Sequence, residues 1–135
     1  MRNSGLFIRE RNGKPVILVV DDEVLVRNFI QMTLTHAGYH VLTASDGVEA
    51  LELSRSYHGA IDLVVSDVKM PNMMGPELAA TISKERPGIH VLLMTGKSSG
   101  RIPPPLRPSL LRKPFFPKQL LEQIHQVLDK PPELE

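Results

Sequence analysis

Short apolar runs alternate along the chain with longer segments in which apolar residues recur every three or four positions. The runs are rich in β-branched side chains, which is the pattern of strands buried on both faces. They cover residues 16–20, 39–44, 61–66, 89–94 and 109–112. The longer segments predict helices over about 26–37, 48–57, 76–86 and 117–130. Strands that alternate with helices predict a parallel sheet with helices on both faces, an α/β fold.

Glycine and proline punctuate this pattern. Gly38 ends the first predicted helix, Pro87 and Gly88 end the third, and Pro117 suits the first turn of the last. The residues that recur at helical spacing in the first helix are Val26, Phe29, Ile30, Thr33 and Ala37. The run at 39–44 is the less hydrophobic, as expected of a strand at the edge of the sheet.

Polar side chains stand where the apolar runs end. Asp21 and Asp22 follow the first run, Asp67 the third, Thr95 the fourth and Lys113 the fifth. Right-handed crossovers place the carboxyl ends of parallel strands on one edge, so these side chains should meet there. A single acid could simply cap the next helix or turn, but two adjacent acids at a strand end suggest a cation site.

Composition narrows the classes of protein. The 135 residues suffice for one domain, with a flexible arm over 1–15, the folded domain over 16–130 and a tail over 131–135. Without cysteine there is neither a disulfide nor a thiolate metal site. A net charge of +1, 4% aromatic residues and no tryptophan argue against direct binding of nucleic acid. No apolar run is long enough to cross a membrane, and we expect a cytoplasmic protein.

The order of these motifs resembles the receiver domain of two-component response regulators. The motifs are Asp21-Asp22, Asp67 with Met70-Pro71-x-Met73-x-Gly75, Thr95-Gly96 and Lys113-Pro114-Phe115. Each motif is weak alone, but together and in this order they are specific. The resemblance covers roughly residues 15–130. It implies a flavodoxin-like, doubly wound sheet of five parallel strands in the order 2-1-3-4-5.

The resemblance also implies a chemistry. Asp67 would accept a phosphoryl group from a histidine kinase or a histidine phosphotransfer protein. Mg²⁺ would be held by Asp22, Asp67 and the backbone carbonyl of Lys69, with Asp21 holding a bound water. Lys113 would pair with one phosphoryl oxygen, and the Thr95 hydroxyl would follow another. Such a domain is a phosphoacceptor that assists its own phosphorylation and dephosphorylation rather than an enzyme.

Further expectations follow from the same resemblance. The Lys113–Pro114 peptide bond should be cis. The chain should act as a stand-alone receiver, a monomer or weak dimer, that binds a downstream protein and neither nucleic acid nor membrane.

The chain departs from the family pattern between Thr95 and Lys113. This segment is short and contains prolines 103, 104, 105 and 108, and Leu110 stands where the family has its switch aromatic. Proline removes amide donors and disfavours a helix interior. We therefore expect the family's fourth helix to be missing or replaced by a proline-rich loop, and phosphate to order residues 96–108 through Thr95 and Lys97.

Two other classes of function remain open. A pseudo-receiver would bind partners without phosphate, although the complete set of acids argues against it. A phosphohydrolase that forms an aspartyl phosphate usually has a second aspartate two residues further on, where this chain has Lys69.

Overall fold

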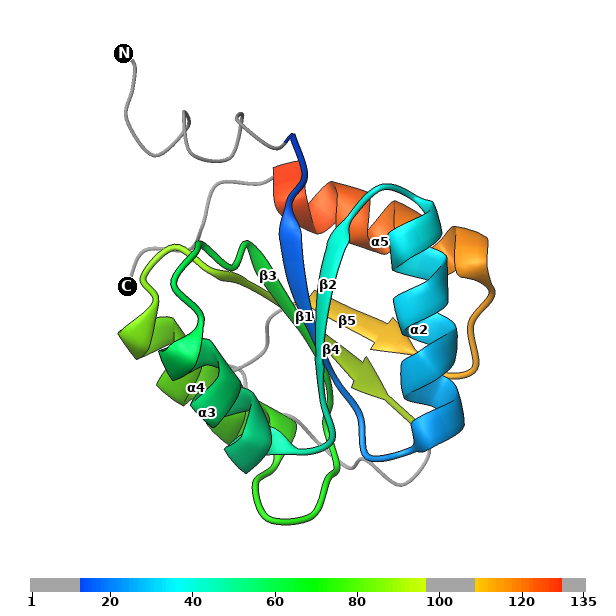
Figure 1. Cartoon of the computed structure of the whole chain (residues 1–135). Coiled ribbons are helices and arrows are strands. Elements are labelled where there is room, and N and C mark those ends of the chain that lie inside the picture. The colour runs from blue at the N-terminus through cyan, green and yellow to red at the C-terminus, as the bar shows by residue number, and fades with distance from the viewer. Residues whose placement is uncertain (1–12, 97–108, 130–135) are drawn as a thin grey trace.

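The fold is a five-stranded parallel sheet between two layers of helices (Figure 1). The structure is a computed structural model and describes residues 13–96 and 109–129. The strands are β1 (Val16–Val20), β2 (His40–Ala44), β3 (Leu63–Asp67), β4 (His90–Thr95) and β5 (Ser109–Arg112). Their order in the sheet is β2-β1-β3-β4-β5, which confirms the predicted fold class.

Four helices of the described residues connect or follow these strands. They are α2 (Val24–His36), α3 (Gly47–Ser56), α4 (Gly75–Glu85) and α5 (Pro117–Asp129). In Figure 1, α2 and α5 cover one face of the sheet, and α3 and α4 cover the other. None of the helices within residues 13–96 and 109–129 has the length and apolarity needed to cross a membrane.

The buried strands divide the core into two halves. Successive side chains of β1 point to opposite faces, so Ile17 and Val19 join one cluster and Leu18 and Val20 join the other. All of these are fully buried. A strand with no solvated side has to be apolar throughout, which explains the continuous runs of the sequence.

The residues that recur at helical spacing in the first helix are not equally buried. Ile30 and Leu34 are its buried residues, whereas Phe29 is 37% exposed and Ala37 lies beyond the helix as its C-cap. Helical spacing alone therefore does not mark each of these residues as buried. The ring of Phe29 lies beside that of Phe115, with the centroids 6.2 Å apart.

The predicted absence of a helix before the fifth strand concerns residues 97–108, which lie outside the described residues. The helix labelled α4 is present, but it connects β3 to β4 and is not the segment in question. The predicted ordering of residues 96–108 by phosphate also concerns residues outside the described ones, apart from Gly96. Leu110 is part of β5 and packs against Val68 and Leu93. The division into an arm, a domain and a tail stays a prediction.

Gly75 closes the loop that follows β3. Its amide donates a hydrogen bond to the carbonyl of Val68 (2.8 Å), and a Cβ at this position would lie 2.3 Å from the Asp67 carbonyl oxygen. Only a residue without a side chain allows α4 to begin so close to the end of β3. The glycine thereby determines where the loop of residues 68–74 can lie.

We predict that Gly75→Ala lowers the free energy of unfolding by about 1–3 kcal/mol, because the methyl group forces the loop away from the strand. Urea unfolding measures the change. Gly96→Ala is the matched control, since a Cβ there meets nothing within 4 Å, and its effect should stay within about 0.5 kcal/mol. Equal stability of the wild type and Gly75→Ala would contradict the close approach.

Candidate functional site

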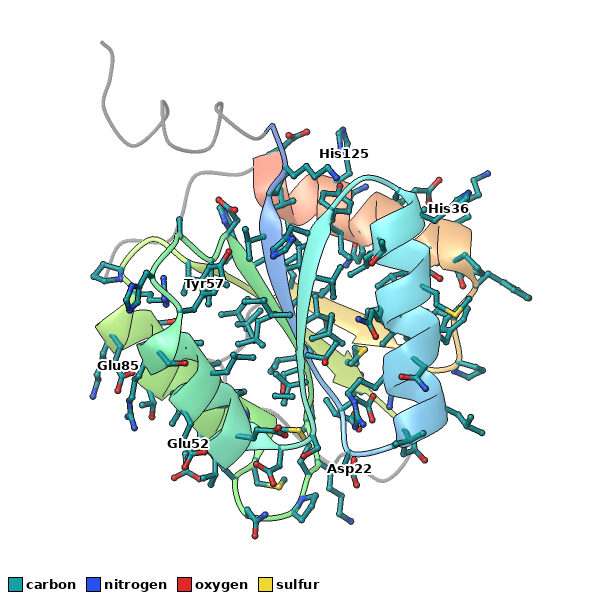
Figure 2. All side chains as sticks on the ribbon, in the orientation of Figure 1. Asp22, His36, Glu52, Tyr57, Glu85 and His125 are labelled. Atoms are coloured by element: carbon teal, nitrogen blue, oxygen red, sulfur yellow. The ribbon has the colours of Figure 1, made fainter. Side chains whose placement is uncertain are left out.

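Three carboxylates gather at the carboxyl edge of the sheet. Asp21 follows β1, Asp22 comes next and Asp67 ends β3, and one oxygen of each lies within 4.8 Å of the others. Asp21 is fully buried and Asp67 is 8% exposed, whereas Asp22 is exposed. Figure 2 shows Asp22 at the end of the molecule opposite to His36 and His125. The parallel strands thus bring together acids that are far apart in the sequence.

Backbone and side-chain hydrogen bonds hold Asp21 in place. Its amide donates to the carbonyl of Ala44 at the end of β2 (3.2 Å), and its Oδ1 accepts from the amide of Glu23 (2.9 Å). The guanidinium of Arg27, on α2, donates to the Asp21 carbonyl (2.7 Å). The side chain of Asp21 therefore has little freedom to leave the edge of the sheet.

Lys113 reaches the acids from the far edge strand. Its Nζ lies 3.2 Å from Asp21 Oδ2, 3.2 Å from Asp67 Oδ2 and 3.8 Å from Glu23 Oε1. Because β4 separates β5 from β3, the side chain has to span two strand spacings, roughly 10 Å. A lysine, with its four-carbon stem, can do this. The Lys113–Pro114 bond is cis, as predicted.

Thr95 meets the site through its backbone. Its carbonyl accepts from the amide of Lys113 (2.7 Å), while its hydroxyl donates to the Gly96 carbonyl (3.4 Å). The structure thus brings Asp21, Asp22, Asp67 and Lys113 together by their side chains, and Thr95 beside them by its position at the end of β4. The predicted contact of the Thr95 hydroxyl with a phosphoryl oxygen stays a prediction.

The site carries more negative than positive charge. Burial raises the pKa of Asp67 to about 6, and Asp21 and Asp22 add to this rise, while Lys113 opposes it. Burial disfavours the charged form of Lys113 as well, but the carboxylates of Asp21 and Asp67 outweigh it and raise the pKa of the ammonium. One ammonium does not neutralise three clustered carboxylates. A bound cation would supply the missing positive charge.

The donor set fits a hard divalent cation. Carboxylate oxygens are the ligands that Mg²⁺ prefers, and the exposed Asp22 leaves one side accessible to water. Lys69 lies two residues beyond Asp67, in the loop of residues 68–74, with its side chain exposed. Its backbone carbonyl remains the predicted ligand from this loop.

Two contacts at the site were not predicted from the sequence. Glu23 was not singled out in the sequence, because an acid at a helix start is common, yet its carboxylate lies 3.8 Å from the ammonium of Lys113. Arg27 was not singled out, because an arginine on a helix usually lies in solvent. Its position four residues after Glu23 gave only a weak signal, since that spacing is also that of an ordinary surface pair.

Comparison with known proteins agrees with this geometry. The family model described as the response regulator receiver domain matches residues 17–103. The chain is 37% identical over 123 residues to the sensor kinase CckA of Brucella abortus, covering 88% of this chain and 13% of that protein. It is 38% identical over 93 residues to the probable transcriptional regulatory protein TcrX of Mycobacterium tuberculosis, covering 68% of this chain and 39% of that protein. The chain thus spans less than half of either relative.

Solved structures share the fold. A response regulator receiver domain protein from Clostridium thermocellum has 31% identity and a TM-score of 0.76, over 85% of this chain and 94% of that one. The receiver domain of the hybrid histidine kinase CckA has 34% identity and a TM-score of 0.71, over 84% and 99% of the two chains.

We predict a pH dependence of stability that comes from Asp67. Its pKa rises from 3.8 to about 6 on folding. The folded chain therefore binds this proton more tightly than the unfolded chain, and stability falls as the pH rises through that interval. Asp67→Asn removes the effect. In buffer with a chelator, the stability of the variant relative to the wild type should increase by roughly 2–3 kcal/mol between about pH 4 and pH 7. Urea unfolding at several pH values measures this, and parallel profiles would contradict it.

Proposed function

Because the chain belongs to the response regulator receiver domain family, we propose that it accepts a phosphoryl group on Asp67 and thereby switches its contacts with another protein. The donor would be a phosphohistidine of a histidine kinase or of a phosphotransfer protein. The observation that carries the proposal is the position of the Lys113 ammonium, 3.2 Å from both Asp21 and Asp67 at the end of the sheet.

In the proposed reaction a carboxylate oxygen of Asp67 attacks the phosphorus atom. The new P–O bond makes an acyl phosphate, the P–N bond to the donor imidazole breaks, and the electron pair of that bond returns to the imidazole. A pKa of about 6 leaves most of Asp67 ionised at neutral pH, so the nucleophile is present without a general base. Phosphoryl transfer of this kind depends mainly on positioning and charge neutralisation.

The residues around Asp67 have separate parts in this proposal. The ammonium of Lys113 would pair with a phosphoryl oxygen instead of the Asp67 carboxylate. The Thr95 hydroxyl would give up its bond to the Gly96 carbonyl and donate to a second phosphoryl oxygen. Asp22, Asp67 and the Lys69 carbonyl would hold Mg²⁺, with Asp21 holding a bound water. The metal ion would neutralise the charge that develops on the phosphoryl oxygens. No separate catalytic activity is needed, since receiver domains are signalling domains.

Membership of the family indicates what kinds of protein the partners are, but not which individual proteins. One relative is named as a sensor kinase and the other as a transcriptional regulatory protein. We propose that this chain likewise takes its phosphoryl group from a kinase or phosphotransfer protein and passes the signal by a protein contact. The alternative, a pseudo-receiver that acts without phosphate, has no supporting contact among the described residues.

We predict that Asp67 is the single site of phosphorylation. Purified protein treated with a small-molecule phosphodonor and Mg²⁺ should gain the mass of one phosphoryl group, and Asp67→Asn should gain none. Asp129→Asn, which changes an exposed aspartate on α5, is the matched control and should label like the wild type. Intact-mass spectrometry measures the labelling. Undiminished labelling of Asp67→Asn would refute the proposed acceptor, and an unlabelled wild type would favour the pseudo-receiver.

We also predict that the site binds Mg²⁺ before phosphate is present. Asp22→Ala should weaken binding by at least about tenfold, because it removes one of few charged ligands. Isothermal titration calorimetry measures the dissociation constant. Glu122→Ala is the control, since it removes the same charge from an exposed position on α5. Equal affinities of Asp22→Ala and the wild type would count against the site.

A further inference from the structure

The end of β2 and the residues just after it contact both the strand end that carries Asp21 and the loop that follows Asp67. The carbonyl of Ala44 accepts the amide of Asp21 (3.2 Å), which fixes the end of β1. Two residues later, Asp46 Oδ2 accepts a hydrogen bond from Asn72 Nδ2 (2.9 Å). Asn72 lies in the loop after Asp67. Residues 44–46 therefore connect the strand end that carries Asp21 to the loop that follows Asp67.

The carboxylate of Asp46 divides its two oxygens between two partners. Oδ1 accepts the amide of Glu49 (2.8 Å) and so caps α3, while Oδ2 serves Asn72. Both hydrogen bonds, that from the Glu49 amide first, lower the pKa of Asp46. Capping needs only one oxygen. The bond to Asn72 is thus additional to what the helix requires.

Asn72 has an unusual backbone. Its φ is 72°, and the amide of Met73 donates to the carbonyl of Pro71 across it (2.7 Å). A three-residue turn centred on a positive φ is rare and strained, and it persists only where its surroundings hold it. Asparagine tolerates positive φ better than most residues. The sharp turn aims the Asn72 side chain at Asp46.

A second contact joins the same two segments. Met73 packs onto Gly47, where a Cβ would lie 2.8 Å from the Met73 Cβ. At the other end of α3 and α4, the guanidinium of Arg55 donates to both carboxylate oxygens of Glu85 (3.0 and 2.6 Å). The two helices are therefore linked at both ends, and Figure 2 shows Glu85 far from Asp22.

We infer that Asn72 is a positioning residue for the metal site: its bond to Asp46 holds the loop of residues 68–74 so that the carbonyl of Lys69 meets the carboxylates at the spacing that Mg²⁺ requires. The inference rests on the proposed function, which supplies the metal. Mg²⁺ demands near-ideal octahedral geometry, whereas Ca²⁺ accepts longer and more variable distances. Displacement of the loop carbonyl should therefore weaken the binding of Mg²⁺ more than that of Ca²⁺.

The experiment compares Mg²⁺ and Ca²⁺ affinities by isothermal titration calorimetry without phosphodonor. Asn72→Gly keeps the positive φ, leaves the charge unchanged and removes the amide. Asn72→Asp places a second carboxylate against Asp46. The double variant Asn72→Asp with Asp46→Asn exchanges donor and acceptor, retains an N-cap oxygen and has the net charge of the wild type. Arg55→Gln is the control, because it removes the link between the same helices away from the site.

We expect Asn72→Gly and Asn72→Asp to weaken Mg²⁺ binding about tenfold. This is the low end of the effect of losing a hydrogen bond outside the ligands of a metal site. The affinity for Ca²⁺ should fall clearly less in Asn72→Gly, a variant with the same net charge as the wild type. The double variant should recover most of the Mg²⁺ affinity, and Arg55→Gln should match the wild type.

A purely structural role would lower stability in urea and leave the ratio of the two affinities unchanged. That result, or a double variant no better than Asn72→Asp, would overturn the inference while the metal site stands. If the wild type binds no Mg²⁺, the proposed function fails first and the inference falls with it.

Discussion

The ammonium group of Lys113 lies between two buried carboxylates of different strands, and the carboxyl edge of the sheet is built around this contact. Burying a carboxylate is costly unless it is paired, and here one cation serves both Asp21 and Asp67. The strand order brings β1 and β3 side by side and leaves β5 two positions from β3. Only a long side chain from β5 can close that distance.

One ammonium does not balance the carboxylates at this edge, and the missing positive charge leaves room for a bound cation. A buried ion pair is weak evidence for stability, since desolvation can exceed the attraction. At this edge, Asp22 adds a third carboxylate to the cluster. Burial raises the pKa of Asp67, Lys113 opposes that rise, and the charges of Asp21 and Asp22 add to it. In the proposed function a metal ion would offset the excess negative charge of the site. The ammonium of Lys113 would then pair with an oxygen of the phosphoryl group. The core of the domain supplies the stability that the site itself lacks.

Helices on both faces of the sheet contact this edge. Arg27 of α2 holds the Asp21 carbonyl from one face, and Asp46 at the start of α3 holds the loop after Asp67 from the other. The strand end that carries Asp21 and the loop that follows Asp67 are therefore each bonded to a different helical layer. Gly75 limits how far that loop can move, because its backbone lies against the end of β3.

The amino-acid sequence determined the sheet, the strand ends and the residues at them, because a strand buried on both faces must be apolar and a charge at its end stands out. Tertiary structure decided what these residues contact. The pairing of Lys113 with Asp21 and Asp67 depends on distances across three strands. The ring of Phe29 contacts that of Phe115, which is far away in sequence. Asn72 bonds Asp46 because a turn at positive φ aims its amide there. Local patterns encode burial, whereas such pairings arise only when separate segments are packed together.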